Sequence, residues 1–346
     1  MFEKIGFVDL RKAILKATRM LGLKTYFFSE EGIYSRVGQR KLPNPFSLLY
    51  LDPWLMLKIL LKRNIGVVHI FSITKRYTSV HKISILRKFT TILTYVGFPK
   101  PLIEISEGAR RYHEAECRFL YKYADTIDLI VAGSNYIRNL LCENLGLKNV
   151  IVIPNCIDTN KFKPLKKGLE DKPRIISVMR LHPAKAPWRI IDIIKYVIKE
   201  IPELEVHIYG EGVLNNLIKY LIHKHQLDKN IKLQGRVSHE RMPDIYPRYS
   251  LYLHTSPIEA LGTSVLEAMA CGIPVLVPST GGAKEAATFP ELIYSNSLDA
   301  SNKLLNLLFD EKKRLWYGKR LRSIAESMYS VNAVAKKYHR LYFRLL

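Results

Sequence analysis

Short apolar runs alternate with amphipathic helical patterns along most of this chain. In the first half the runs are IGFVD, TYFF, GVVHIF, PLIEIS, TIDLIVAGS and NVIVIP, and in the second half they are RIISV, EVHIYG, IKLQG, SLYLHT and IPVLVP. Buried parallel strands that are separated by helices give this alternation. The sequence therefore predicts an α/β fold with two Rossmann-like, doubly wound domains, for which 346 residues are sufficient.

A polar segment rich in lysine and proline separates the two halves. The run IPNCIDTNKFKPLKKGLEDKPR follows the last apolar run of the first half, and its Asn, Asp and Pro residues are typical of a connection. We place the linker near residues 160–173 and predict domains over residues 1–165 and 166–328. The last segment, VNAVAKKYHRLYFRLL, predicts an amphipathic helix within residues 329–346.

The segment SPIEALGTSVLEAMACGIP contains the most informative local pattern. A strand that ends near His254 leads into a polar loop, and a helix is expected to begin near Gly262 and to end at Gly272. The backbone N–H groups of Gly262, Thr263 and Ser264 then have no intrahelical acceptor, and the helix dipole adds positive potential at the same place. The pattern therefore predicts a site for an anion such as a diphosphate.

Seven residues separate two glutamates in this segment. Glu259 lies in the loop before the helix and Glu267 lies more than one turn inside it, so the two carboxylates can contact different ends of one ligand. A carboxylate can also accept two hydrogen bonds from a vicinal diol. The spacing fits equally well a capping acid at Glu259 and a solvated helix residue at Glu267, and it leaves both interpretations open.

Two cations share a loop further upstream. The segment RIISVMRLHPAKAPW predicts a strand, a loop with Arg180 and Lys185, and a helix from about Trp188. A cation at about 4 Å stabilises a departing diphosphate by roughly 4 kcal/mol at an effective dielectric constant near 20. Basic residues in a loop are more often only surface charge, so the pair gains weight from the downstream pattern.

Together these motifs resemble the retaining glycosyltransferases of family 4, also called glycosyl transferases group 1, which have the GT-B fold. The resemblance rests on E-x7-E before AMACG-x-P and on R-L-x-x-x-K, and it extends over roughly residues 124–290. It implies that Arg180 and Lys185 clamp the diphosphate of a nucleotide sugar, that Glu259 lies near the donor sugar, and that Glu267 binds the ribose. Met179 and Ala186 depart from the family, which has glycine at both positions.

Weaker matches occur in the order that the family shows. The resemblance implies that donor-side loops contain Gly210, Gly212, Gly235, Arg236, Val237 and Leu261, and that Gly281 and Gly282 face the cleft on the acceptor side. Any one of these glycines fits a simple turn. In GT-B proteins the terminal helix crosses back to the first domain, which would place residues 329–346 there.

The first half departs from the family in two places. No glycine-rich loop follows IGFVDL, and the family's catalytic-site histidine, expected after PLIEIS, is replaced by Glu107. Glu107, or His113 further along, is a candidate for orienting an acceptor hydroxyl, but a Glu or His that opens a helix is commonly structural. An unusual acceptor, a shortened start and a loss of activity all fit these departures.

The chain is strongly basic, with a net charge of +23. Residues 53–103 contain nine Lys or Arg and no Asp or Glu, and the stretches WLMLKILLKR and SVHKISILRKFTTILTYVGF combine apolar with basic residues. An interfacial helix on an anionic membrane has this composition, and so does a buried helix with a basic exposed face. The first interpretation favours a glycan, glycolipid or lipid-linked acceptor at the membrane.

Several expectations follow from what the sequence lacks. No apolar run approaches the roughly 18 residues of a membrane span, and the N-terminus has no secretory core, so we expect a cytoplasmic or peripheral protein on the inner face of the membrane. The four cysteines form no C-x-x-C pair, and neither zinc nor disulfides are expected. Because no D-x-D motif occurs, we expect a metal-independent reaction without a cofactor, in which a UDP- or GDP-sugar is the donor.

Two other functions remain open on the sequence. A degenerate transferase scaffold with this positive field can bind an anionic membrane or other polyanions without catalysis. No RNA-reading motif is present, so specific nucleic-acid binding is not expected. A sugar-nucleotide epimerase can use a similar two-domain scaffold and needs no acceptor. The sequence does not determine the oligomeric state.

Overall fold

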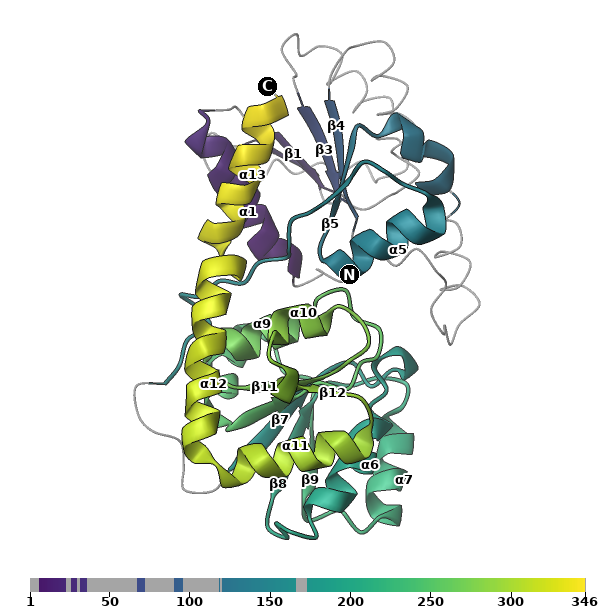
Figure 1. The fold of residues 1–346 in the computed structure, drawn as a ribbon, viewed down its shortest axis with the longest axis vertical. Coiled ribbons are helices and arrows are strands. Elements are labelled where there is room, and N and C mark those ends of the chain that lie inside the picture. Colours follow the sequence, from purple (N-terminus) through teal and green to yellow (C-terminus); the bar gives the residue numbers. More distant parts are fainter. Residues whose placement is uncertain are drawn as a thin grey trace.

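The fold contains two separate parallel sheets (Figure 1). The computed structural model describes residues 6–22, 26–29, 32–35, 67–71, 90–95, 118, 120–165 and 173–345. Within them, the first sheet has the strand order β3-β4-β5-β6, and every pair in it is parallel. Its strands are β3 (Val67–Phe71), β4 (Thr90–Tyr95), β5 (Leu129–Ala132) and β6 (Val150–Val152).

The second sheet has six strands in the order β12-β11-β10-β7-β8-β9, again all parallel. From β7 the chain proceeds outward through β8 and β9, and it then returns to the other side of β7 with β10. The order therefore reverses between β7 and β10, and ligands of doubly wound folds bind at such a switch point, beyond the carboxyl ends of the strands. The strands are β7 (Arg174–Val178), β8 (Glu205–Tyr209), β9 (Ile231–Gly235), β10 (Leu251–Leu253), β11 (Val275–Pro278) and β12 (Ile293–Tyr294).

Helices connect these strands and cover both sheets (Figure 1). They form because apolar residues recur at helical spacing and face a core. In α6, for example, the five buried residues Ile190, Ile191, Ile193, Ile194 and Val197 face the second sheet's core. The named helices are α1 (Gly6–Met20), α5 (Asn135–Leu145), α6 (Trp188–Val197), α7 (Asn215–Lys224), α8 (Met242–Ile245), α9 (Thr263–Ala270), α10 (Ala283–Ala287), α11 (Ser297–Phe309), α12 (Glu311–Ile324) and α13 (Val331–Leu345).

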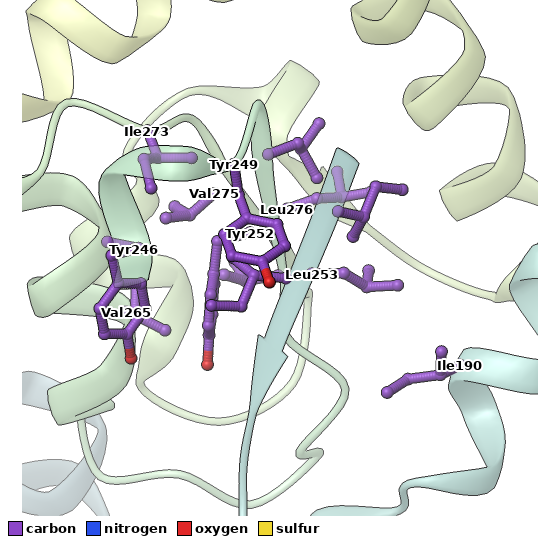
Figure 2. Close-up of a cluster of buried hydrophobic side chains, with 14 of the residues drawn as sticks. Ile190, Tyr246, Tyr249, Tyr252, Leu253, Val265, Ile273, Val275 and Leu276 are labelled. Atoms are coloured by element: carbon purple, nitrogen blue, oxygen red, sulfur yellow. The ribbon is translucent and has the colours of Figure 1, made fainter. Parts of the chain in front are cut away.

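The core of the second sheet extends directly beneath the switch point. Figure 2 shows three tyrosines, Tyr246, Tyr249 and Tyr252, among aliphatic side chains of β10, α9 and β11. The Tyr252 ring is fully buried, and its hydroxyl lies 3.3 Å from the carbonyl oxygen of Val178 at the end of β7. Buried tyrosines need a polar partner for the hydroxyl group, and here the partners lie at the carboxyl ends of the strands.

The run IGFVD was predicted to be the first strand, and this prediction is wrong. Residues 6–20 form one helix, α1, in which Leu10, Ala13, Ile14 and Ala17 are buried. These positions lie three or four residues apart and form one face that packs against α13. A short apolar run fits a strand or a buried helix equally well, and the longer spacing decides in favour of the helix.

The basic stretch SVHKISILRKFTTILTYVGF was predicted to be a helix, and its described part is a strand instead. Residues 90–95 form β4, which lies between β3 and β5, and Ile92 and Leu93 are fully buried. A β-branched run such as TTILT packs well in the middle of a sheet. All nine Lys and Arg residues between 53 and 103 lie outside the described residues.

The other apolar runs within the described residues form strands as predicted. The run TYFF forms β1 (Tyr26–Ser29), but β1 pairs antiparallel with β2 (Gly32–Ser35) in a separate two-stranded sheet. The runs GVVHIF, TIDLIVAGS and NVIVIP form β3, β5 and β6, and all five runs of the second half form strands. The predicted strand PLIEIS lies outside the described residues.

The C-terminal helix packs on the first sheet's side of the molecule. Helices α12 and α13 run along one edge, and α13 lies beside α1 (Figure 1). The buried residues Tyr338 and Tyr342 of α13 contact the ring of His69 in β3, and the Tyr342 hydroxyl lies 2.6 Å from its Nδ1 atom. Helix α13 therefore packs against α1 and β3 of the first half. The boundaries at residues 165 and 328 remain our proposal.

No helix among the described residues is long and apolar enough to span a membrane.

Candidate functional site

The β7–α6 loop carries the two predicted cations. Arg180 is exposed, and Lys185 ends a short 3-10 helix, Pro183–Lys185. The next residue, Ala186, is buried and has a left-handed backbone with φ 45°. The loop therefore takes this conformation although the family's glycine is missing, at a cost of roughly 1–2 kcal/mol for a residue with a Cβ atom.

Gly210 and Gly212 hold this loop in place through close backbone contact. A Cβ atom on Gly210 would lie 1.8 Å from the carbonyl oxygen of Met179, and one on Gly212 would lie 2.3 Å from that of Leu181. Gly210 also has a φ of +131°, which side chains rarely allow. The resemblance placed both glycines in a donor-side loop, and in the structure they let the backbone approach the loop that carries Arg180.

The loop after β10 is tied to the β7–α6 loop by side-chain hydrogen bonds. The Thr255 hydroxyl donates to the carbonyl oxygen of Lys185 at 3.2 Å, and the Ser256 hydroxyl lies 3.1 Å from that of Ala184. Thr255 and Ser256 are buried. Because β7 and β10 are neighbours in the sheet, these bonds fix the two loops against each other at the switch point.

Lys185 and Glu259 form an ion pair across these loops. The Lys185 Nζ atom lies 2.5 Å from Oε2 of Glu259, and about a fifth of each side chain is exposed. Burial raises the pKa of Glu259, but the positive charge of Lys185, with a smaller contribution from Arg180, outweighs this effect. The net shift of the Glu259 pKa is downward, and the carboxylate is ionised at neutral pH. The predicted phosphate-binding lysine is thus paired with the predicted sugar-binding glutamate.

The N-terminus of α9 lies beside Glu259. Gly262 is the N-cap with φ 88°, and a Cβ atom on it would lie 3.4 Å from Cγ of Glu259. No side chain caps this helix, so the first N–H groups, those of Thr263 and Ser264 among them, have no intrahelical acceptor. The Ser264 hydroxyl lies 2.8 Å from that of Tyr252. The predicted anion site and the predicted cation loop therefore meet at one place, and Leu261 is buried next to them.

Glu267 is buried, with an exposed fraction of 4%, and both of its oxygen atoms accept hydrogen bonds. Tyr246 donates to Oε2 at 2.8 Å, and Nε2 of His239 lies 2.7 Å from Oε1. The ring of Phe162, from the connection between the two sheets, packs 5.5 Å from the His239 ring. Glu267 is therefore a fixed acceptor with two further lone-pair directions left for a ligand.

The end of β9 is connected to the end of β8. The carbonyl oxygen of Gly235 accepts from the N–H of Gly210, and the Arg236 N–H donates to Oε1 of Glu211 at 3.3 Å. Gly235 has a φ of +71°, and Arg236 is exposed next to the half-buried Val237. These predicted donor-side residues lie at the carboxyl end of the sheet, and two strands, β7 and β8, separate them from β10.

Gly281 and Gly282 lie against the loop of Glu259. A Cβ atom on Gly282 would lie 1.8 Å from the carbonyl oxygen of Ala260, and one on Gly281 would lie 3.0 Å from the backbone nitrogen of Glu259. The Gly282 N–H donates to the Glu259 carbonyl oxygen at 2.7 Å. These glycines therefore determine where the Glu259 backbone lies. The other acceptor-side candidates, Glu107 and His113, lie outside the described residues.

Sequence reasoning missed three side chains of this region: His239, Tyr246 and His254. His239 and Tyr246 hold Glu267 from segments more than 20 residues upstream, and no local pattern indicates such a contact. His254 had one local signal, because it directly follows the buried strand β10 at the ligand-binding edge of a parallel sheet. It lies 3.9 Å from Glu259 and is buried.

Within the described part of the chain, no three His, Cys, Asp or Glu side chains are grouped so that they could hold a metal ion. Lys185 is paired with Glu259, and Arg180 lies close enough for its charge to lower the pKa of Glu259 as well. The expectation of a metal-independent reaction remains a prediction.

Two family models match the chain, one in each half. The model described as Glycosyl transferases group 1 matches residues 157–324, and the model described as Glycosyltransferase Family 4 matches residues 22–161. The first match contains the β7–α6 loop, the α9 N-terminus and both glutamates. The predicted resemblance to this family is confirmed.

Curated relatives are similar over part of their length. The chain is 28% identical over 197 residues to the GPI3 subunit of phosphatidylinositol N-acetylglucosaminyltransferase from Saccharomyces cerevisiae, which is 53% of this chain and 44% of that protein. It is 31% identical over 142 residues to the gpi3 subunit of the Schizosaccharomyces pombe enzyme of that name, which is 41% of this chain and 31% of that protein. The chain spans less than half the length of these relatives.

Solved structures share the fold at low sequence identity. A glycosyltransferase from Rickettsia africae has a TM-score of 0.74 at 18% identity, covering 98% of this chain and 95% of that chain. An Anabaena protein crystallised with UDP and glucose has a TM-score of 0.67 at 18% identity, covering 85% and 81%. The predicted α/β fold class with two Rossmann-like domains, GT-B, is therefore confirmed.

Proposed function

The chain belongs to glycosyltransferase family 4 of the group 1 glycosyl transferases, and from this premise we propose that it transfers a hexose from a nucleoside diphosphate sugar to a glycan, glycolipid or lipid-linked acceptor. One observation supports this most directly. Lys185, Arg180 and the uncapped N-terminus of α9 converge at the switch point of the second sheet. This combination suits a diphosphate that gains negative charge as its bond to the sugar breaks.

Each site residue has a proposed role in this reaction. Lys185, Arg180 and the α9 amides stabilise the departing diphosphate, so no metal ion is required. Glu259 accepts a hydrogen bond from a hydroxyl group of the donor sugar. Glu267 uses its two remaining lone-pair directions for the ribose hydroxyls while His239 and Tyr246 hold it in place. Retention of configuration at the sugar carbon is part of the proposal and follows from the family alone.

We propose a UDP-sugar as the donor and a lipid-linked acceptor on the inner face of a membrane. The Anabaena neighbour was crystallised with UDP, and the name of the Saccharomyces cerevisiae relative indicates transfer of N-acetylglucosamine to phosphatidylinositol. UDP-N-acetylglucosamine is therefore the first donor to test. The net charge of +23 favours an acceptor at an anionic surface, because each nearby cation contributes about 1 kcal/mol there.

Lys185→Ala tests the enzymatic role of the cation loop. We expect transfer or donor hydrolysis to fall by about 100-fold or more, since the change removes a cation from the departing charge. The matched control is Lys229→Ala, which removes an exposed lysine far along the sequence and should leave the rate unchanged. Activity of Lys185→Ala within about threefold of the wild type would remove this residue from the mechanism.

A second candidate is a non-catalytic protein that binds an anionic surface through its charge. The departures of the first half from the family motif favour it, whereas the complete set of Arg180, Lys185, Glu259 and Glu267 favours the enzyme. Thermal shift distinguishes them. Stabilisation by UDP or GDP, but not by an equal charge of pyrophosphate, supports a nucleotide-sugar enzyme, and equal stabilisation by all three supports the charge-only alternative.

A further inference from the structure

His254 carries a buried nitrogen atom with no hydrogen-bond partner among the described residues, and it points into the proposed site. The side chain is 2% exposed, and its Nε2 atom forms no hydrogen bond. Oε2 of Glu259 lies 3.9 Å from this nitrogen, which is too far for a hydrogen bond. A buried polar atom without a partner costs roughly 1–3 kcal/mol, so it calls for an explanation.

The surroundings of His254 fix its ring and select its proton position. The ring stacks on Tyr252 at 6.1 Å, and the Tyr252 hydroxyl lies 3.3 Å from Nδ1. The backbone is held too, because the His254 carbonyl oxygen accepts from the Tyr294 hydroxyl at 2.8 Å. The Tyr252 hydroxyl donates to Ser264 at 2.8 Å, and the negative charge of Glu259, 3.9 Å from Nε2, favours the neutral tautomer that carries its proton on Nε2. Nε2 is then a donor directed toward Glu259.

The same oxygen of Glu259 is occupied by Lys185 in this structure. The Lys185 Nζ atom lies 2.5 Å from Oε2, so the two residues neutralise each other. A diphosphate bound between Lys185 and the α9 N-terminus competes with Glu259 for the ammonium group. Without a substitute donor, Glu259 would then lose its close hydrogen-bonded partner in a largely buried place, which is unfavourable for a carboxylate.

We infer that His254 is a positioning residue that takes over Glu259 when the donor diphosphate draws Lys185 away. This role rests on the proposed function. A movement of about 1 Å brings Nε2 and Oε2 within hydrogen-bond distance. The exchange keeps Glu259 ionised and oriented toward the sugar while Lys185 neutralises the phosphate. It also explains why Nε2 of the buried His254 has no hydrogen-bond partner in the described part of the chain although it lies next to the Lys185–Glu259 ion pair.

Two amide substitutions separate this role from simple packing. In His254→Gln the side-chain amide can reach the place of Nε2, whereas in His254→Asn it reaches only the place of Nδ1. Affinity for UDP is measured by calorimetry in the presence and absence of Glu259→Gln, which removes the charge that needs a partner. We expect His254→Asn to weaken UDP binding about tenfold and His254→Gln by less than about threefold when Glu259 is intact.

In the Glu259→Gln background the difference between the two amides should fall below about twofold. If the Asn and Gln variants weaken UDP binding equally in both backgrounds, His254 is a packing residue and this inference is wrong. If the wild-type protein binds neither UDP nor GDP, the proposed function itself fails, and the role of His254 fails with it. Thermal melting of each variant confirms that it is folded before binding is compared.

Discussion

At the scale of single residues, the site gathers ionisable groups in a largely buried place. Lys185 and Glu259 form an ion pair, and the neutral His254 lies next to it. Burial lowers the pKa of His254 to about 4 and that of His69, under α13, to about 3. Both rings are therefore neutral in the folded protein at a pH where they are protonated in the unfolded chain.

These pKa shifts predict that the free energy of unfolding decreases as the pH is lowered into the acid range. Because the unfolded state binds more protons between pH 6.5 and about 4, the contribution of His254 is complete above pH 6.5 and is lost as the pH falls toward 4. Between pH 7 and 4.5 the free energy of unfolding of His254→Gln should therefore decrease by about 2 kcal/mol less than that of the wild type. Urea denaturation at the two pH values measures this difference.

The exposed His225 supplies the control, since His225→Gln should follow the wild-type curve. His69 is present in every variant and adds the same decrease to each. An identical acid dependence in the wild type and in His254→Gln would show that the His254 ring is not kept neutral by burial.

Sequence motifs indicated Arg180, Lys185 and Glu259 because their spacing relative to strands and helices is local. The structure brings these residues together, and their roles remain predictions. His239 and Tyr246 escaped because their partner, Glu267, comes from another element. The same holds for the Lys185–Glu259 ion pair, whose two members are 74 residues apart. Local patterns identify which residues carry chemistry, whereas their pairing depends on the sheet order.

At the scale of elements, glycines determine how closely neighbouring loops approach. The end of β8 contacts the loop after β7 at Gly210 and Gly212, and the loop after β11 contacts the Glu259 loop at Gly282. These contacts set the positions of Arg180 and Glu259 without touching a ligand. The sequence predicted donor-side loops at Gly210 and Gly212 and a cleft-facing loop at Gly282, but not that each of these glycines contacts another loop.

Gly210→Ala tests this positioning role. The new Cβ atom would lie 1.8 Å from the Met179 carbonyl oxygen at a φ of +131°, so we expect destabilisation by about 3 kcal/mol or more. Gly133→Ala is the matched control. Gly133 also follows a parallel strand, but its nearest neighbour would be the Asn155 side chain at 3.7 Å, so a cost below about 1 kcal/mol is expected. Chemical denaturation compares the two, and equal losses would contradict the assignment.

Strand predictions were correct where short apolar runs were flanked by turn residues. They were wrong where basic residues lay next to a strand in the sequence, as at β4, and where a short apolar run belonged to a longer helix, as at α1. The basic residues that flank TTILTY in the sequence concealed β4, whose own residues are uncharged and mostly buried. The run IGFVD is the start of α1, whose buried face becomes visible only when residues 6–20 are taken together. Both elements are stabilised by contacts that are distant in sequence. β4 pairs with β3 and β5, and α1 packs against α13.

At the scale of the whole molecule, side chains from the second half hold the first half. Glu285 of α10 accepts from the backbone N–H groups of Asn135 and Tyr136, at 2.9 and 2.6 Å, and so binds the N-terminus of α5. Arg322 of α12 donates to the carbonyl oxygens of Thr159 and Phe162 in the connection between the sheets. The two halves are therefore joined by hydrogen bonds as well as by α13.

Glu285→Ala should weaken this connection. The carboxylate satisfies two helix N-terminal donors and interacts favourably with the helix dipole, so its loss should cost about 1 kcal/mol and should speed hydrogen exchange at Asn135 and Tyr136. Glu200→Ala, which removes an exposed carboxylate at the end of α6, should leave these amides unchanged. Unchanged exchange in Glu285→Ala would mean that the two halves are not held together at this point in solution.

A crystal structure of the protein soaked with UDP tests the central claim most directly. We predict that the β-phosphate lies between Lys185 Nζ and the amides of Thr263 and Ser264, that the Lys185–Glu259 pair is broken, and that His254 Nε2 has closed to hydrogen-bond distance from Glu259. UDP bound elsewhere, or bound there while Lys185 remains on Glu259, would contradict the account.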